Sequence, residues 1–165
     1  MSARPFRSVL YIPGSKERAL DKARGLAADA IIFDLEDAVA PEEKVAARAV
    51  LAEALTAGGY GARARIVRVN GLDTAWGAED LAVFGAHPAV EALLIPKVNT
   101  AADLAAVAAK APGKPLWAMM ETALGMLNAA EIAAYPGLQG MVMGTNDLAK
   151  ELGSRYRPDR LAMQA

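Results

Sequence analysis

The stretch Leu116-Trp-Ala-Met-Met-Glu-Thr-Ala-Leu-Gly125 indicates how this chain folds. Its first five residues form a continuous apolar run, which is typical of a strand covered on both faces in a parallel sheet. The run ends at Glu121, a carboxylate that is costly to bury without a cation or hydrogen-bond donors. A second apolar run, residues 140–144, leads in the same way to Asp147. Two acids that follow neighbouring strands are well placed to share one metal ion.

The length and composition predict one domain, residues 1–165, with a sizeable core. Hydrophobic residues make up 54% of the chain, yet no apolar run approaches the ~20 residues of a membrane span. The first residues lack the apolar segment of a signal peptide. We therefore expect no membrane association and a cytoplasmic location.

Several chemistries are excluded by residue type. The chain has no cysteine, so it offers no disulfide, thiolate nucleophile or cysteine metal ligand. Its 18 Lys and Arg against 19 Asp and Glu form no basic block, and only 5% of residues are aromatic, which argues against nucleic-acid binding. The single histidine, His87, precedes a predicted strand, at the opposite end from the acids. A Ser–His or His–metal mechanism would need residues outside this chain.

Strands and helices alternate along the chain. The predicted strands are residues 7–12, 30–33, 65–69, 90–95, 116–120 and 140–144. The predicted helices are residues 16–26, 41–56, 75–84, 100–110, 123–134 and 147–152. This alternation predicts a parallel sheet with right-handed crossovers.

Polar residues at the strand ends favour a barrel over an open sheet. No Gly-x-Gly-x-x-Gly follows the first strand, which counts against dinucleotide binding. A barrel gathers side chains from many strand ends around one axis. Such side chains follow nearly every strand: Asp34, Glu36, Arg68, Lys97, Glu121 and Asp147. The prediction is an α/β fold, a (β/α)8 TIM barrel that is incomplete here, because about six β/α units are countable and a full barrel takes ~250 residues.

The leading candidate metal ligands are Glu121 and Asp147. With only oxygen ligands on offer, the cation should be hard, Mg²⁺ or Mn²⁺. Alternatively, each acid caps the helix that follows it. Arg68 interrupts an apolar strand, which suits an anion or oxyanion contact, or a buried ion pair with Asp34 or Glu36.

Two lysine features leave alternatives open. Lys97 at a strand end is a candidate Schiff-base lysine if burial lowers its pKa, or an ammonium paired with Glu121 or Glu36. Lys16, Arg18 and Lys22 follow the first strand. They form either a phosphate contact or a solvated helix face.

The ordered motifs resemble the citrate lyase β-subunit/malyl-CoA lyase family of the HpcH/HpaI aldolase superfamily. The resemblance spans nearly the whole chain and rests on Leu10-Tyr-Ile-Pro-Gly14, Phe33-Asp-Leu-Glu-Asp37, Ala40-Pro-Glu-Glu-Lys44, Arg68-Val-Asn-Gly-Leu-Asp-Thr74, Ile95-Pro-Lys97, Met120-Glu-Thr-Ala-Leu-Gly125 and Gly144-Thr-Asn-Asp-Leu148. It implies a (β/α)8 barrel that cleaves or forms a carbon–carbon bond in a 3-hydroxyacyl-CoA such as malyl-CoA or citryl-CoA. The partners would be a CoA thioester and a 2-oxoacid, and the assembly a homo-oligomer.

The resemblance also implies site residues. Glu121 and Asp147 would hold Mg²⁺, and Arg68 would bind substrate and stabilise the enolate of the departing acetyl thioester. Arg68 and Glu121 are the expected catalytic residues. The expected substrate contacts are Arg68, Glu121, Glu36, Asp37, Lys16 and Lys22, the two lysines lying near the CoA moiety.

The chain departs from the family pattern in two ways. Family members continue beyond the last motif, so we expect a C-terminal part of the barrel to be missing. Leu124 stands where several citrate lyase relatives have arginine. Three other functions stay open: an acyl-CoA thioester hydrolase on the same scaffold, a Schiff-base aldolase using Lys97, and an inactive fragment.

Overall fold

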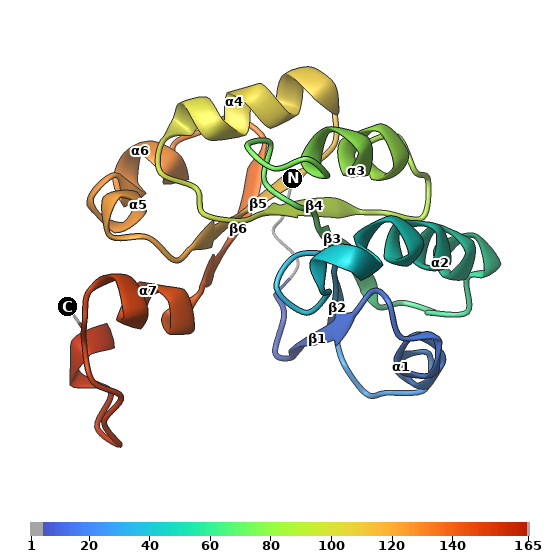
Figure 1. The fold of residues 1–165 in the computed structure, drawn as a ribbon, viewed down its shortest axis with the longest axis horizontal. Helices are drawn as coiled ribbons and strands as arrows, with labels where there is room; N and C mark the ends of the chain where they lie inside the picture. The colour runs from blue at the N-terminus through green and yellow to red at the C-terminus, as the bar shows by residue number, and fades with distance from the viewer. Residues whose placement is uncertain (1–4, 165) are drawn as a thin grey trace.

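The protein, described by a computed structural model over residues 5–164, contains one parallel sheet of six strands in the order β1-β2-β3-β4-β5-β6 (Figure 1). The strands are β1 Val9–Pro13, β2 Ala30–Asp34, β3 Ala64–Arg68, β4 Ala92–Ile95, β5 Leu116–Met120 and β6 Leu138–Met143. The α-helices are α1 Glu17–Ala23, α2 Lys44–Ala57, α3 Gly77–Phe84, α4 Ala101–Lys110, α5 Ala123–Leu127, α6 Ala129–Ala133 and α7 Thr145–Glu151, with 3-10 turns η1 Pro41–Glu43 and η2 Leu161–Met163. The six strands alternate with helices along the chain, as the sequence predicts.

Two predicted helices are divided. The segment 41–56 begins as the turn η1 and continues as α2. Pro41 is the first residue of η1, a position where the missing N–H breaks no helical hydrogen bond. The segment 123–134 splits into α5 and α6 at Asn128, whose side chain donates to the carbonyl of Asn99 at 2.9 Å. Asn128 has φ −95° and ψ 11°, outside the helical range, so the break lies at this residue.

Side chains alternate between two apolar layers along each strand. Odd positions of β2 and β3, such as Ile31 and Val67, pack outward against helical residues. Even positions, such as Ile32 and Ile66, form an inner cluster completed by Ala30, Ala64, Ala92, Leu94, Trp117 and Met119. Asp34, Arg68 and Glu121 continue the inner set at the strand ends, so the pleat itself directs them to the inside of the sheet.

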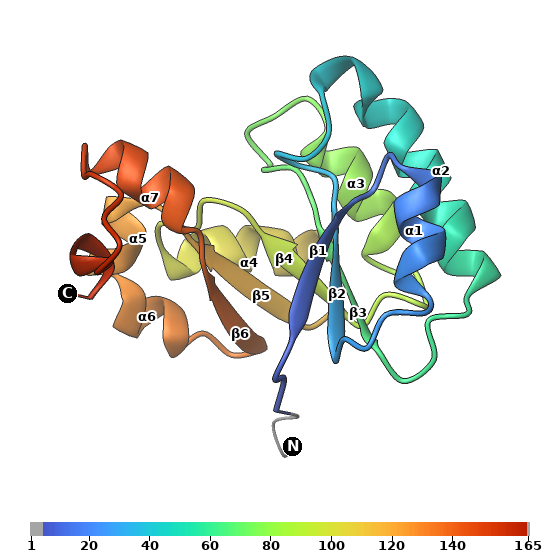
Figure 2. The ribbon, with the colours of Figure 1, turned by 90° about the horizontal axis from the view of Figure 1, so that it is seen from below.

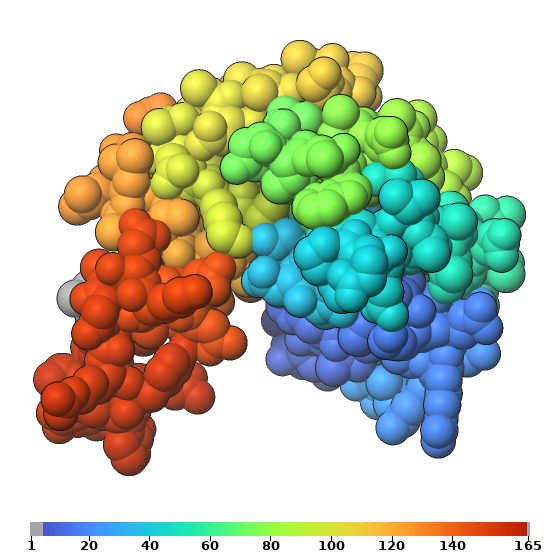
Figure 3. Space-filling model, viewed as in Figure 1, coloured from blue at the N-terminus to red at the C-terminus, as the bar shows by residue number. Residues whose placement is uncertain are grey.

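The sheet is strongly curled, with helices α1–α6 on its outer side (Figures 1 and 2). Space-filling atoms show a hollow between the N-terminal and C-terminal parts of the chain (Figure 3). Within residues 5–164, the edge strands β1 and β6 each pair on one side only. The prediction of an α/β fold with about six β/α units is confirmed, because six parallel strands form a curled half-barrel (Figure 1). No helix in the described range is long and apolar enough to cross a membrane.

Candidate metal and substrate site

The centre of the site is a buried ion pair between β2 and β3. Arg68 Nε donates to Asp34 Oδ1 at 2.8 Å and Nη2 donates to Oδ2 at 2.6 Å, a bidentate geometry. The Asp34 carboxylate also accepts the backbone N–H groups of Glu36 and Ala38, at 2.8 and 3.2 Å. Both charged side chains are almost fully buried. Arg68 is therefore held rigidly, as the ion-pair alternative for this residue predicted.

The remaining side of Arg68 faces the loop after β2. Its Nη1 lies 2.8 Å from Glu36 Oε2 and 3.3 Å from Asp37 Oδ2. Burial disfavours the charged form of Asp37, but the charges of Arg68 and Lys97 and the hydrogen bonds of Glu36 and Arg68 together outweigh it and lower the pKa of this carboxyl. Asp37 is consequently ionised and available as an oxygen ligand.

Lys97 connects this loop to the end of β6. Its ammonium lies 2.7 Å from Glu36 Oε1 and 3.3 Å from Asp147 Oδ2. Burial acts against the ammonium, but the hydrogen bond to Glu36 and the charges of Glu36, Glu121 and Asp37 together outweigh it and raise the pKa of Lys97. A Schiff-base lysine needs a lowered pKa, so this environment does not favour that alternative.

Glu121 is a buried carboxylate with one backbone donor. Its Oε1 accepts the N–H of Lys97 at 2.9 Å, and Lys97 holds the left-handed conformation, with φ 51°. Burial raises the pKa of Glu121 despite this hydrogen bond and the nearby positive charges. Gly144 lies against it: a Cβ there would approach the Glu121 Cβ to 2.4 Å and Oε2 to 2.6 Å. Glycine is required because the end of β6 passes directly over this side chain.

Neither acid of the predicted metal pair caps a helix. Thr122, not Glu121, caps α5 by accepting the N–H of Gly125 at 3.0 Å. Asp147 lies in the first turn of α7, where the N-cap position, Gly144, makes no side-chain cap. The capping alternative therefore accounts for neither carboxylate.

Three carboxylates that follow β2, β5 and β6 lie close together at the carboxyl ends of the strands. Oxygen atoms of Asp37, Glu121 and Asp147 lie within 4.8 Å of one another. Together with Asp34 and Glu36 they make five carboxylates around the two cations Arg68 and Lys97, a formal excess of three negative charges. An all-oxygen donor set with surplus negative charge suits a hard divalent cation such as Mg²⁺. The residues present thus fit the expected metal.

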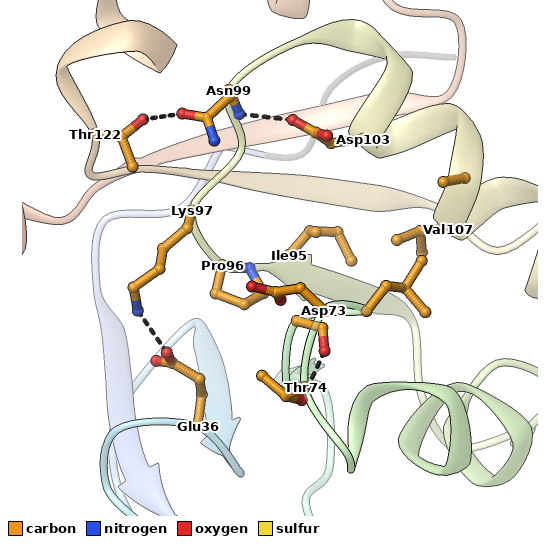
Figure 4. A pocket seen from close by; sticks show the side chains of 13 residues that line it. Glu36, Asp73, Thr74, Ile95, Pro96, Lys97, Asn99, Asp103, Val107 and Thr122 are labelled. Carbon is orange, nitrogen blue, oxygen red and sulfur yellow. Dashed lines mark hydrogen bonds and ion pairs between the residues drawn. The ribbon is translucent and has the colours of Figure 1, made fainter.

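Two cavities adjoin this cluster. One, of about 420 Å³, extends from β1 to β6 and is lined by Tyr11, Arg68, Met119, Glu121, Met143 and Asp147, among others. The second, of about 770 Å³, lies between the loops after β3 and β4, with Glu36 and Lys97 at its edge (Figure 4). Figure 4 shows the Lys97 side chain extending from its loop toward Glu36. This ion pair therefore lines the second cavity and borders the carboxylate cluster.

The two predicted CoA-contacting lysines differ in position. Lys16 follows β1 and forms an ion pair with Glu43, Nζ to Oε1 at 3.1 Å, on the surface. Lys22 lies in the last turn of α1, away from the carboxyl end of the sheet. His87 lies, as predicted, in the loop before β4, where its Nδ1 accepts the N–H of Ala89 at 3.2 Å.

Sequence reasoning missed two features of the site. Asp37 was expected to contact substrate, whereas its oxygen completes the carboxylate group with Glu121 and Asp147. The sequence feature that could have indicated a metal ligand here is the group of three acids, Asp34, Glu36 and Asp37. Tyr11 was overlooked: the Arg68 guanidinium lies over its ring, 5.6 Å from the centroid, and burial raises the pKa of its phenol to about 12. In the structure Tyr11 pairs with inward-facing Ile32, and the sequence alone does not give this register.

A curled parallel sheet with acids and a buried arginine at its strand ends is the scaffold of a TIM-barrel-type enzyme. The chain belongs to the HpcH/HpaI aldolase/citrate lyase family, whose model matches residues 7–165. The recognition of this family from the motifs is confirmed.

The curated relatives correct the predicted reaction. A "(3S)-malyl-CoA thioesterase" of Cereibacter sphaeroides is 75% identical over 163 residues, covering 99% of this chain and 57% of the relative. An "L-malyl-CoA/beta-methylmalyl-CoA lyase" of the same organism is 40% identical, covering 92% of this chain and 52% of the relative. This chain thus spans little more than half of either. The prediction of a carbon–carbon lyase is wrong, since the relatives at 70–75% identity are thioesterases. The motifs did not distinguish which bond is cleaved.

Solved structures support the fold and the cation. The citrate lyase β subunit of Mycobacterium tuberculosis, complexed with oxaloacetate and magnesium, has a TM-score of 0.78 and 33% identity, covering 96% of this chain and 66% of that one. Protein CitE of the same organism, in complex with magnesium, acetoacetate and coenzyme A, has a TM-score of 0.76 and 33% identity, covering 96% and 55%.

Proposed function

We propose that this chain provides the metal-binding half of a hydrolase that cleaves the thioester bond of a malyl-CoA-type substrate. The observation that carries the proposal is the group of three carboxylates, Asp37, Glu121 and Asp147, beside the fixed guanidinium of Arg68. The choice of hydrolysis is supported by the thioesterase relatives at 70–75% identity. The finer fold prediction, closure into an eight-stranded barrel, is part of this proposal, as is assembly into a homo-oligomer.

The proposed metal is Mg²⁺, with Mn²⁺ as a substitute of similar ligand preference. Asp37, Glu121 and Asp147 would hold it. When bound, the ion would supply a Lewis acid that polarises the oxygens of the substrate. Of the three ligands, Glu121 would gain most from a bound cation, because its buried carboxylate has one backbone donor and a raised pKa. Neighbours solved with magnesium support the assignment.

Arg68 and Lys97 would hold the anionic acid part of the substrate. Arg68 is preorganised by Asp34, so it loses little side-chain freedom when it contacts a carboxylate. Lys97 lies on the opposite side of Glu36 and adds a second positive charge at the same edge. Glu36 would keep both cations in place, which makes it a support for substrate binding.

The CoA moiety would extend from the carboxyl ends of the strands toward α1. Lys16 would carry positive charge for its phosphates once it exchanges its ion pair with Glu43. Lys22, in the last turn of α1, lies away from this end of the sheet and has no part in the proposal. A solved neighbour holding coenzyme A together with magnesium supports a CoA-bound substrate.

The overall reaction would consume one water. Its oxygen bonds to the acyl carbon, the carbon–sulfur bond breaks, and the sulfur leaves as the free thiol of CoA once protonated. The products would be malate and CoA.

The complete protein would test this proposal directly. Incubation with (3S)-malyl-CoA should release malate and free thiol in equal amounts, and EDTA should abolish the release until Mg²⁺ is added back. An Arg68→Lys variant should raise KM, because lysine cannot reproduce the bidentate geometry. Formation of acetyl-CoA and glyoxylate in place of malate and CoA, or full hydrolysis in EDTA, would overturn the proposal.

A further inference from the structure

Lys44 is a buried cation to which the proposed reaction assigns no role. It is the first residue of α2 and is 7% exposed. Its ammonium donates to the carbonyl oxygens of Leu35 at 2.9 Å and Glu36 at 2.7 Å, and lies 5.3 Å from the centre of the Trp76 ring. Burying an ammonium is costly, and these partners offset the cost only while all of them are in place.

The two carbonyls belong to the loop that carries Glu36 and Asp37. The amide side of the same loop is also fixed, because the N–H groups of Glu36 and Ala38 donate to the Asp34 carboxylate. The peptide groups are therefore held from both sides, carbonyls toward Lys44 and amides toward Asp34. The side chains of Glu36 and Asp37 are left to face Arg68.

A second buried network holds the same loop through Asn70. Its side-chain amide donates to the carbonyl of Leu35 at 3.1 Å and to Asp80 at 2.7 Å, and Asp80 is paired with Arg48 at 2.7 Å. The carbonyl of Leu35 thus accepts from Lys44 and Asn70, and that of Glu36 accepts from Lys44 and from the N–H of Val39 at 3.2 Å. Lys44 is the donor that the two carbonyls share, so loss of the ammonium would loosen both peptide groups at once.

We propose that Lys44 is a positioning residue: its ammonium fixes the peptide groups of Leu35 and Glu36, and this aims Asp37 at the metal site and Glu36 at Arg68 and Lys97. The inference rests on the proposed function, since it assigns Asp37 to the metal. It gives a role to the lysine that ends the motif Ala40-Pro-Glu-Glu-Lys44.

The test compares Lys44→Met and Lys44→Arg in the complete protein. Lys114→Met is a matched control, because the Lys114 ammonium also donates to two backbone carbonyls, of His87 at 3.0 Å and Val90 at 2.8 Å, but at the opposite end of the strands. Mn²⁺ affinity would be measured by electron paramagnetic resonance, and amide hydrogen exchange at Glu36 and Ala38 by mass spectrometry or NMR.

Lys44→Met should weaken Mn²⁺ binding roughly 10- to 100-fold, the usual effect of losing a group that orients a metal ligand. It should also speed exchange at Glu36 and Ala38. Lys44→Arg should restore most of the affinity, because a guanidinium can donate to both carbonyls. Lys114→Met should change neither readout, whatever its effect on the unfolding temperature.

Two results would overturn the role of Lys44: wild-type affinity and exchange in Lys44→Met, or equal losses in Lys114→Met. Failure of the unaltered protein to bind Mn²⁺ would instead refute the metal site. In that case amide exchange at Glu36 and Ala38 would be the only test of whether Lys44 holds the loop. Unchanged exchange in Lys44→Met would reject this role of Lys44.

Discussion

Asp34 and Arg68 are direct partners in the register of β2 and β3, and their side chains form two parallel hydrogen bonds at 2.8 and 2.6 Å. Both residues follow the inner apolar positions of their strands, so sheet geometry alone brings them together. The pair joins the backbone of the loop after β2 to a cation beside the carboxylate cluster.

Replacement of Asp34 by asparagine should destabilise the protein strongly. The Arg68 guanidinium would keep Glu36 and Asp37 near Nη1 but would face a neutral amide at Nε and Nη2. Removing one member of a buried pair costs about 3–5 kcal/mol when no charged partner remains, so the free energy of unfolding, measured with urea, should fall by up to that amount. Asp29→Asn is the control, because Asp29 pairs with an Arg7 side chain that is 88% exposed, and exposed ion pairs contribute little to stability. Equal losses in the two variants would contradict a special role for the buried pair.

Glu121→Gln should remove metal binding without unfolding the protein. A glutamine oxygen can still accept the N–H of Lys97, while the anionic ligand is lost. Unaltered protein in Mg²⁺ at about 100 times its dissociation constant should gain about 2.7 kcal/mol of stability over protein in EDTA. The variant should gain almost none. Glu131→Gln is the matched control, because Glu131 also accepts a backbone N–H, from Ala101 at 3.3 Å, and lies outside the cluster.

The pH dependence of stability without metal should reveal the burial of Glu121. Burial raises its pKa, so the folded protein keeps this proton to a higher pH than the unfolded chain does. The stabilisation from the protonated carboxyl is complete below the ordinary pKa of 4.5 and is lost as pH rises through the raised value. In EDTA, the unaltered protein should therefore lose stability relative to Glu121→Gln as the pH rises from the ordinary pKa of 4.5 toward neutrality. Parallel stability curves for the two proteins would refute this expectation.

Much of the fold and part of the site follow from local sequence pattern. The apolar runs of β2 and β5 predict buried strands, and their period of two carries Asp34 and Glu121 to the inner face. The ion-pair alternative for Arg68 follows from the same rule.

What could not be predicted lies beyond the strands. Asp37 follows the end of β2 by three residues, where strand alternation no longer applies, and hydrogen bonds from Lys44 and to Asp34 set its direction. The break between α5 and α6 lies at Asn128, whose side chain contacts a different loop. The carbon–carbon lyase prediction is contradicted by the thioesterase relatives at 70–75% identity, because the quoted motifs record the acids and the arginine but not which substrate bond is cleaved.

Gly144→Ala should weaken metal binding through a purely steric effect. The added methyl would meet the Cβ and Oε2 of Glu121 at 2.4 and 2.6 Å, so the carboxylate or the end of β6 must move. Gly144 has a φ of −90°, which alanine adopts without strain, so the effect should come from crowding alone. We expect a loss of about 1–3 kcal/mol in stability and at least a tenfold loss in Mn²⁺ affinity, on the order seen when a metal ligand is misoriented.

Gly25→Ala provides the control for this crowding. A Cβ at Gly25 would have the carbonyl oxygen of Lys22 at 3.8 Å as its nearest neighbour, an ordinary contact, so both stability and Mn²⁺ affinity should stay close to those of the unaltered protein. The decisive comparison places Gly144→Ala in a Glu121→Gly background, because glycine lacks both Glu121 atoms that the added methyl would meet. Crowding predicts that Gly144→Ala costs less stability in this background than in the unaltered protein. If the two losses simply add, Gly144 acts independently of Glu121, and the close approach of β6 to this carboxylate has no energetic consequence.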